Sequence, residues 1–566
     1  MGVSQEEPSK AAASETIGTS GPDAEVGDVS SLKVPEAVNP GSAHTHRGLR
    51  PRHVQLAAIA GGIGVGLFVG IGKVLVNAGP LALLLGYLIY GIGFIWPCNL
   101  CTAEMVTWLP VRGSVFGLAT RYVDPALGFA LGWTYFYAGA MFVCTELSAV
   151  ATVVQFWDVD VNPAIWVAVV LFLCTTLNLF AVRWYGESEF VMSITKVLLL
   201  IGLVLFTFIT MVGGNPKHDA YGFRAWKNGN AMHPYYTGGN TGRLLAVAIA
   251  IRFAVFTLSG PDFISLSAGE IQNPRRTIPR LAQLIFYRLV GFYVIGSLAV
   301  GIICSSRDSN LITAIKGGKP GAAASPWVIG IRNTGVTGGL PGLINVLILV
   351  SAVSCGNAFV YQSSRTLYSL AQEGQAPKFF LTCSKQGIPY FCVLAVSLIG
   401  CITFLVADNA AINVFGWFVD LSTSGLIVNF TCFFWVYLGW YRALKAQNFD
   451  RKTLPYYCNF APYTAWFGLI FGCLIIFFLG FDSFSPFSVQ SFITTYFGVA
   501  WCGSMFLLWK ILKRTKFVDP ATADIYEGKA EVDAECAIWE HGGLVENEKH
   551  RLAEMSAVRR AWEKIW

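Results

Sequence analysis

The chain has 566 residues, of which 54% are hydrophobic and 13% are charged. Soluble globular proteins carry about 25% charged residues, so this chain has too few charges to cover a water-facing surface. The composition excludes an ordinary soluble enzyme and a disordered protein, and it favours a protein with many membrane spans. A net charge of +6 over this length does not suggest nucleic-acid binding.

The two ends of the chain are polar. Residues 1–50 are rich in Ser, Ala, Gly, Pro and Glu without apolar periodicity, so we expect a disordered cytoplasmic tail there. No apolar core follows Met1, so no cleavable signal peptide is expected. Residues 513–566 are polar again, and the segment AECAIWEH within them is consistent with a short helix. We expect a transporter-like helical domain over 51–512.

Twelve apolar runs of about 20 residues, long enough to span a bilayer, separate these tails. The predicted fold is therefore an all-α membrane protein with 12 transmembrane helices. The runs lie near 54–76, 80–105, 127–153, 162–182, 189–212, 245–268, 284–304, 340–370, 389–407, 411–438, 462–481 and 492–512.

The distribution of Lys and Arg predicts the orientation of these spans. If the N-terminus is cytoplasmic, the four short loops on the opposite side contain no Lys or Arg, whereas the loops on its own side are rich in both. Short loops carry the positive-inside signal. Both termini are therefore expected to face the cytoplasm.

Two spans contain sequences that interrupt a helix. The first has six glycines within AIAGGIGVGLFVGIG (58–72), and the sixth has a Gly260-Pro261 pair within FTLSGPDFISLSAGE (256–270). Proline removes a backbone donor and clashes with the preceding turn. Broken helices are tolerated in a membrane where they line a cavity. Their positions, first and sixth, fit inverted repeats of helices one to five and six to ten.

Two facing breaks suit a zwitterion. The N-terminus of a half-helix exposes N–H groups that can bind a carboxylate, and an unwound C-terminal end exposes carbonyls that can bind an ammonium group. The crossing point is therefore predicted to bind an amino acid. The alternative is that the glycines are helix-packing sites, since Gly66 and Gly70 have GxxxG spacing. A dinucleotide-binding loop is excluded because the glycines lie inside an apolar run.

The residues also resemble a known family. RHVQLAAIAGGIGVGLFVGIGKVLVNAGP, TRYVDPALGFALGWTYFY, SAGEIQNPRRTIPR and SSRTLYSLAQEGQAPKFF occur in the order found in fungal-type amino acid permeases. These belong to the amino acid–polyamine–organocation superfamily, which has the leucine-transporter fold. The resemblance covers about 52–520 and implies proton-driven uptake of amino acids across the plasma membrane.

The resemblance also implies roles for the residues at the two breaks. The substrate carboxylate would be held by Gly62, Ile63, Gly64, Val65 and Gly66. The amino group would be held by Phe256, Thr257, Leu258, Ser259 and Gly260, with Phe256 closing over the substrate. The family more often has threonines at the positions of Gly62 and Val65, and a Thr-Glu pair at Pro261-Asp262, which leaves the substrate preference open.

Charged residues inside spans are costly and therefore functional candidates. Lys196 in the fifth span occupies the place that sodium takes in sodium-coupled relatives and is the best candidate for a proton switch; alternatively it reaches toward the cytoplasmic interface. Asp262 either takes part in coupling or caps the second half of the sixth helix. Glu146 in the third span is a substrate or proton-path candidate. Glu104, near the end of the second, fits a structural acid.

Arg252 lies one helical turn before Phe256 in the sixth span. Its guanidinium could bind an acidic substrate side chain, which makes it a selectivity candidate, or it could reach to the outer interface.

No enzyme, metal or cofactor is predicted. The chain has no nucleophile–base constellation, and the CxxC pair of Cys98 and Cys101 lies in an apolar run without a second pair. The sequence thus predicts a proton-coupled L-amino acid transporter working by alternating access, with substrate, proton and lipid bilayer as partners. Two alternatives stay open: an amino acid receptor with little flux, and a transporter of polyamine- or carnitine-like cations.

Overall fold

Helices account for nearly all regular structure in the part of the chain that this computed structural model describes. That part comprises residues 61–110, 114–157, 160–179, 182–258, 262, 265, 268, 271, 273–317, 325–384, 387–541, 550 and 553–556. No β-strand occurs in these ranges. The predicted tail 1–50 lies outside the described residues.

The first half of the chain forms eleven helices or helical turns within the described ranges. Ten of them are the π-helix η2 (Gly66–Gly70), α2 (Ile71–Ala78), α3 (Pro80–Tyr90), α4 (Trp96–Trp108), α5 (Ser114–Tyr122), α6 (Pro125–Val154), α7 (Pro163–Leu179), α8 (Val182–Met211), the 3-10 turn η4 (Arg224–Trp226) and α9 (Gly239–Thr257). A second π-helix, Gly91–Ile95, joins α3 to α4 into one continuous rod.

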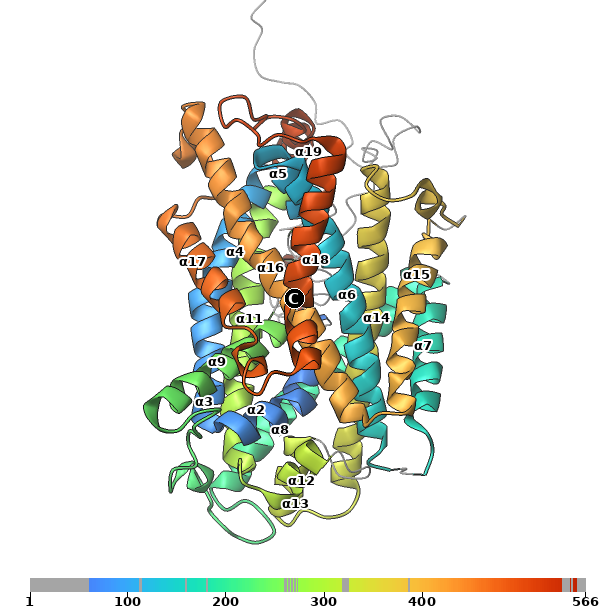
Figure 1. The fold of residues 1–566 in the computed structure, drawn as a ribbon, viewed down its shortest axis with the longest axis vertical. Coiled ribbons are helices and arrows are strands. Elements are labelled where there is room, and N and C mark those ends of the chain that lie inside the picture. Colours follow the sequence, from blue (N-terminus) through green and yellow to red (C-terminus); the bar gives the residue numbers. More distant parts are fainter. Residues whose placement is uncertain are drawn as a thin grey trace, which may run out of the picture. The chain divides into compact units, whose positions relative to one another are not determined.

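The second half adds the remaining long helices (Figure 1). They are α11 (Pro274–Ile303), α12 (Ser309–Gly317), α13 (Pro326–Asn333), α14 (Gly339–Gln372), α15 (Tyr390–Gly400), α16 (Ala411–Ala446), α17 (Tyr463–Phe477), α18 (Val489–Lys513) and α19 (Lys529–His541). The last of these contains the segment AECAIWEH for which a short helix was expected.

Ten helices of the described part are long and apolar enough to cross a membrane. They correspond to ten of the twelve predicted runs. The other two runs correspond to shorter apolar helices, Gly66–Ala78 and Pro163–Leu179. The sixth run differs most from its predicted range, because α9 begins at Gly239 and ends at Thr257, ahead of the predicted end at 268.

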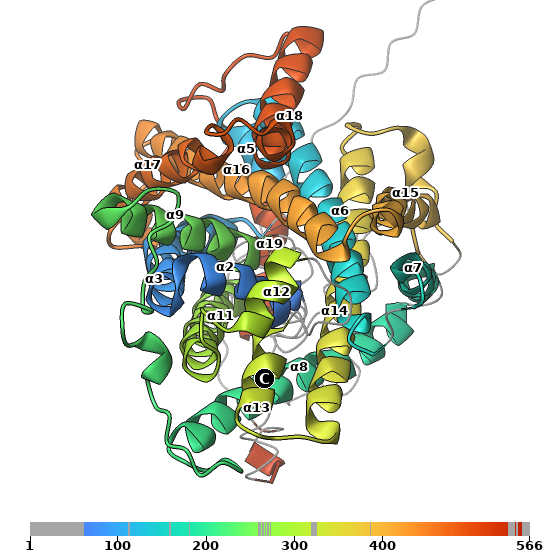
Figure 2. The ribbon, with the colours of Figure 1, turned by 60° about the horizontal axis from the view of Figure 1, so that its bottom comes forward.

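The central helix α6 is buried, whereas the peripheral helices expose large apolar side chains. Nearly every residue of α6 is buried, and α6 packs along both α14 and α16 (Figure 2). On α7, α8, α17 and α18, by contrast, large apolar side chains are exposed, among them Phe172, Leu198, Tyr463 and Ile511. Apolar side chains facing outward on the peripheral helices are typical of a surface that contacts lipid.

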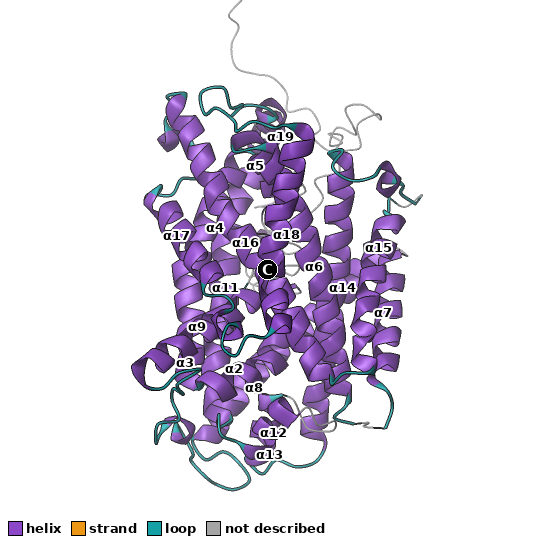
Figure 3. Ribbon diagram, in the orientation of Figure 1, coloured by secondary structure: helices purple, strands orange, loops and turns teal. Residues whose placement is uncertain are grey.

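The long helices run between two ends of the bundle (Figures 1 and 3). One end carries α12 and α13, and we call it the α12 end. The other carries α5 and α19, and we call it the α19 end. α8 finishes at the α12 end, where Lys217 donates to the carbonyl of Asn333 in α13. α6 starts at the α19 end, where Asp124 accepts hydrogen bonds from Lys510 and Thr515.

Candidate functional site

The first helix break lies at Ile63 and Gly64. Gly61 and Gly62 are helical, Ile63 and Gly64 form a bend, and the chain then continues through η2 into α2. Side chains from other helices donate hydrogen bonds to the backbone carbonyls that the break exposes. Tyr293 of α11 donates to the carbonyl of Gly62, and Ser351 of α14 donates to that of Ile63 at 3.4 Å. The break is thus held open by two neighbouring helices.

Glu146 of α6 reaches directly into this break. Its Oε2 accepts a hydrogen bond from the backbone N–H of Val65 at 3.3 Å. Gly64 makes this approach possible, because a Cβ at this position would lie 2.2 Å from Glu146 Oε1 and 2.8 Å from Cys355 Sγ. The Glu146 carboxylate therefore binds a backbone N–H group of the first break. Such a group was predicted to bind the carboxylate of the substrate.

The second break begins where α9 ends. Thr257 is the last helical residue, and Leu258 adopts an extended conformation with φ −93° and ψ 95°. Thr257 Oγ1 is hydrogen-bonded to the hydroxyl of Tyr87 at 3.2 Å. Ser259 and Gly260, which were also assigned to this break, lie outside the described residues.

A small cavity lies between the two breaks, and in this conformation it has room for about one water molecule. It brings together several predicted site residues with others that were not predicted, namely Gly61, Gly62, Gly64, Gly66, Phe142, Glu146, Phe256, Thr257, Tyr293 and Cys355. Ile63, Val65 and Leu258 are buried beside it but do not line it.

Three aromatic rings from different helices stack beside the cavity. Phe142 of α6 lies between Phe256 of α9 and Phe359 of α14, with ring centroids 5.2 Å and 4.3 Å apart. Aromatic contacts of this kind add to simple burial. Phe256 therefore forms part of an apolar wall that joins the second break to α6 and α14.

The other two coupling candidates, Lys196 and Asp262, are also buried. Lys196 of α8 is 1% exposed and interacts electrostatically with Glu146. Asp262 is 3% exposed, and its Oδ2 accepts a hydrogen bond from Tyr135 of α6 at 2.8 Å. Gln362 of α14 in turn donates to the Tyr135 hydroxyl. Asp262 thus links the region after the second break to α6 and α14.

Arg252 points away from the cavity. It donates to Asp420 of α16 at 2.5 Å, to Asp482 at 3.2 Å and to the carbonyl of Leu479 at 3.1 Å. An acidic substrate would have to displace one of these partners. Glu104 is fully buried and accepts two hydrogen bonds from Arg451, as a structural acid would.

Four residues at or near the cavity were not predicted from the sequence: Phe142, Tyr293, Cys355 and Phe359. Phe142 precedes Glu146 by one helical turn, so the helical period could have found it once Glu146 was chosen. Tyr293 and Cys355 had no comparable signal, because their partners Gly62 and Gly61 lie more than 200 residues away in the chain.

Comparison with known proteins gives a consistent picture. The profile of the family described as amino acid permease matches residues 53–520. A proline-specific permease of Emericella nidulans is 38% identical over 497 residues, covering 87% of this chain and 90% of the relative. A probable proline-specific permease of Schizosaccharomyces pombe is 41% identical over 440 residues, 77% of this chain and 79% of the relative. A lysine-specific permease of Saccharomyces cerevisiae is 33% identical over 526 residues, 92% of this chain and 82% of the relative.

These matches cover most of the chain and most of each relative, and they agree with the apolar helices of the described part. They indicate a multi-pass membrane protein that takes part in amino acid transport, and a transporter rather than an enzyme. The chain belongs to the amino acid permease family.

Proposed function

We propose that the protein is a proton-coupled importer of L-amino acids that works by alternating access. The observation that carries this proposal is the cavity between the two helix breaks, with Glu146 bound to the backbone N–H of Val65. In this proposal twelve spans form the transporter over 51–512, and the first ten form a 5+5 inverted repeat. The α19 end and both termini face the cytoplasm, and the membrane is the plasma membrane.

The cavity supports a simple coupling mechanism. A substrate carboxylate at the first break competes with Glu146 for the same backbone donors. Two carboxylates at one site repel each other, so substrate binding favours a proton on Glu146. The ammonium group lies at the carbonyls of the second break, near Thr257, and Phe256 closes over the substrate. Lys196, which interacts with Glu146, adjusts its charge state to that of the glutamate.

We propose a small neutral amino acid, with proline first, as the substrate. Relatives at 38% and 41% identity are named for proline. The described lining consists mainly of glycine and aromatic residues, and Glu146 contributes its carboxylate. An acidic side chain would meet repulsion from this carboxylate.

Reconstituted protein tests this proposal. Uptake of radiolabelled proline into proteoliposomes, with a pH-sensitive dye inside, should be accompanied by acidification of the lumen. Competition by the other common amino acids and by a polyamine and carnitine then ranks the substrates. Uptake without acidification would refute proton coupling, and binding without uptake would favour a receptor. Stronger competition by the polyamine or carnitine than by any amino acid would favour the cation-transporter alternative.

A further inference from the structure

A second buried carboxylate lies on α8, outside the cavity. Glu189 is 6% exposed and precedes Lys196 by seven residues, so both lie on the same face of the helix. Ser354 of α14 donates to its Oε1, and Asn357 of α14 donates to its Oε2 at 3.1 Å. Asn178 of α7 donates to the side-chain oxygen of Asn357 at 2.9 Å. Three helices therefore meet at this carboxylate.

Glu146, Lys196 and Glu189 form an electrostatic triad. Lys196 interacts with both glutamates, and the three side chains are 2%, 1% and 6% exposed. With both glutamates ionised, the triad has two negative charges and one positive charge. An uncompensated charge is unfavourable in so buried a place. One added proton makes the triad neutral, so burial favours the form of the triad that carries this extra proton.

Other ionisable groups lie on the helices packed against the triad. They are the thiols of Cys355 on α14 and Cys174 on α7, the phenol of Tyr293 on α11, and, further toward the α19 end, Arg288 on α11 and Arg365 on α14.

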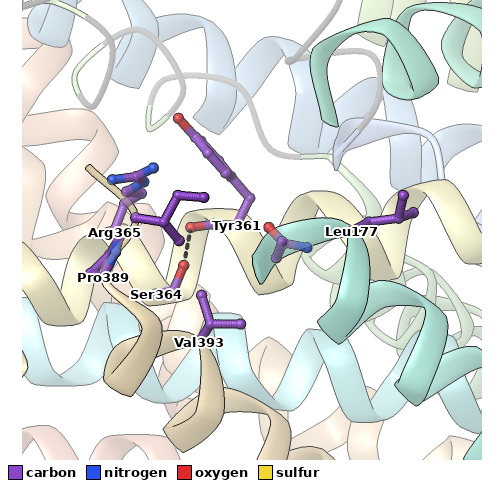
Figure 4. Close-up of a pocket in the computed structure, with 8 residues that line it drawn as sticks. Leu177, Tyr361, Ser364, Arg365, Pro389 and Val393 are labelled. Atoms are coloured by element: carbon purple, nitrogen blue, oxygen red, sulfur yellow. Dashed lines mark hydrogen bonds between the residues drawn. The ribbon is translucent and has the colours of Figure 1, made fainter. Parts of the chain in front are cut away.

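A pocket at the α19 end approaches Glu189 from the other side. It is a small pocket lined by residues of α7 and α14 and by the start of α15 (Figure 4). Asn178 lines this pocket and is also the first member of the hydrogen-bond chain that ends at Glu189. Arg365 stands at the pocket, with its guanidinium over the ring of Tyr361 and a hydrogen bond to the carbonyl of Gly387. Two side-chain hydrogen bonds thus separate the pocket from the buried carboxylate.

We propose that Glu189 is the exit residue for the coupled proton, and that this proton leaves the protein through the pocket between α7, α14 and α15. This inference rests on the proposed function, because it needs a proton-coupled cycle. The cavity end of the route is Glu146, the middle is Lys196, and the α19 end is Glu189.

The proton balance is simple. Lys196 donates a proton to the Glu189 carboxylate, and the Glu146 carboxyl then returns a proton to Lys196. In this proposal Asn178 and Asn357 turn aside, so that cytoplasmic water from the pocket reaches the Glu189 carboxyl and takes its proton. The cycle leaves both glutamates ionised and Lys196 protonated, and one proton has moved from the cavity to the cytoplasm. Asn178 and Asn357 position the Glu189 carboxylate and do not themselves carry the proton.

The decisive experiment compares proton and substrate movement in Glu189→Gln. Proteoliposomes with an internal pH dye and radiolabelled proline give both rates from one preparation. We expect the ratio of protons to proline to fall about tenfold or more, because the proton acceptor is gone while hydrogen-bonding capacity is kept. Uptake should also lose its dependence on external pH. Glu373→Gln, at the end of α14 and outside the route, should keep the wild-type ratio and pH profile.

Two further variants keep the test conclusive if Glu189→Gln fails to fold. Glu189→Asp keeps an acceptor and should restore the proton ratio, and Asn178→Leu separates the pocket from the carboxylate and should slow acidification more than proline exchange. A wild-type proton ratio in Glu189→Gln, or in Asn178→Leu where the former does not fold, would overturn the inference. Absence of proline uptake by wild-type protein would instead refute the proposed transport, and uptake without acidification would refute its coupling.

Discussion

The two ends of the bundle hold their buried charges differently. Toward the α12 end, one cation serves two carboxylates, since Arg252 binds both Asp420 and Asp482. At the α19 end, two buried carboxylates each have a cation of their own: Glu104 has Arg451, and Asp124 has Lys510. A shared cation can lose one bond and keep the other, whereas a dedicated pair must break entirely. The α12 end is therefore built to rearrange more easily than the α19 end.

The same difference is visible in the number of donors at each carboxylate. Glu104 accepts from Arg451 at 3.0 and 2.6 Å, from Tyr437 at 2.7 Å and from the N–H of Cys458 at 3.1 Å. Asp482 accepts from Arg252 at 3.2 Å and from Tyr235 at 2.8 Å. Burial and the neighbouring Asp482 raise the pKa of Tyr235 well above its ordinary value, so this phenol stays a donor.

The largest expected effect is at Glu104. In Arg451→Met its fully buried carboxylate loses its cation, which should cost roughly 3–5 kcal/mol of stability. The measurement is the thermal unfolding midpoint of purified protein in detergent. Lys452→Met, an exposed neighbour, is the matched control and should unfold like the wild type. The double variant Glu104→Leu/Arg451→Met should be more stable than Arg451→Met alone. Equal midpoints for Arg451→Met and Lys452→Met would show that the pair contributes little.

Arg252→Ala should have the next largest effect. It leaves Asp420 and Asp482 facing each other without their shared cation, at a cost of about 1.5–3 kcal/mol for the lost charged hydrogen bonds. Because two carboxylates already bind the guanidinium, we expect uptake of proline, and whatever uptake of aspartate the wild type shows, to fall by the same factor. Measuring both in cells that express equal amounts of protein tests this. A loss confined to aspartate would instead assign Arg252 to an acidic substrate.

Local features of this structure could be predicted from the sequence, whereas the side-chain pairings at the two ends could not. Hydropathy located the apolar runs, and Gly and Pro patterns located the breaks at Ile63–Gly64 and after Thr257, because these are local signals. The partners of Arg252 are 168 and 230 residues away, and those of Glu189 on α14 are 165 and 168 residues away. No local pattern contains such pairings. Glu189 could still have been noticed as an acid two turns before Lys196.

A smaller effect is expected where the C-terminal segment docks at the α19 end. Asp124 accepts from Lys510, Thr515 and the N–H of Ala126, so Lys510→Met removes its cation and leaves the other two donors in place. Residues 515–527 should then become more sensitive to limited proteolysis, because Thr515 is held by the same carboxylate. Lys513→Met, whose ammonium lies over the ring of Trp509, is the control. Unchanged proteolysis would mean that the other contacts of the segment hold it alone.

The smallest effect concerns pH and is confined to the α12 end. His233, in the connection between α8 and α9, contacts Ser306 Oγ at 2.7 Å, and its backbone N–H donates to Ala78. Burial, and secondarily Arg307, lowers the pKa of His233 in the folded protein. The unfolded chain, with a His pKa of about 6.5, therefore binds the proton more readily. The stability that neutral His233 contributes is full above about pH 6.5 and declines as the pH falls through this value.

The unfolding midpoint of the wild type should drop more between about pH 7 and 5 than that of His233→Asn, which has no titrating group. His218→Asn, an exposed histidine in the same connection, should behave like the wild type. If His233→Asn keeps the full pH dependence, the sensitivity lies elsewhere, and the α12 end is no more responsive to acid than the α19 end.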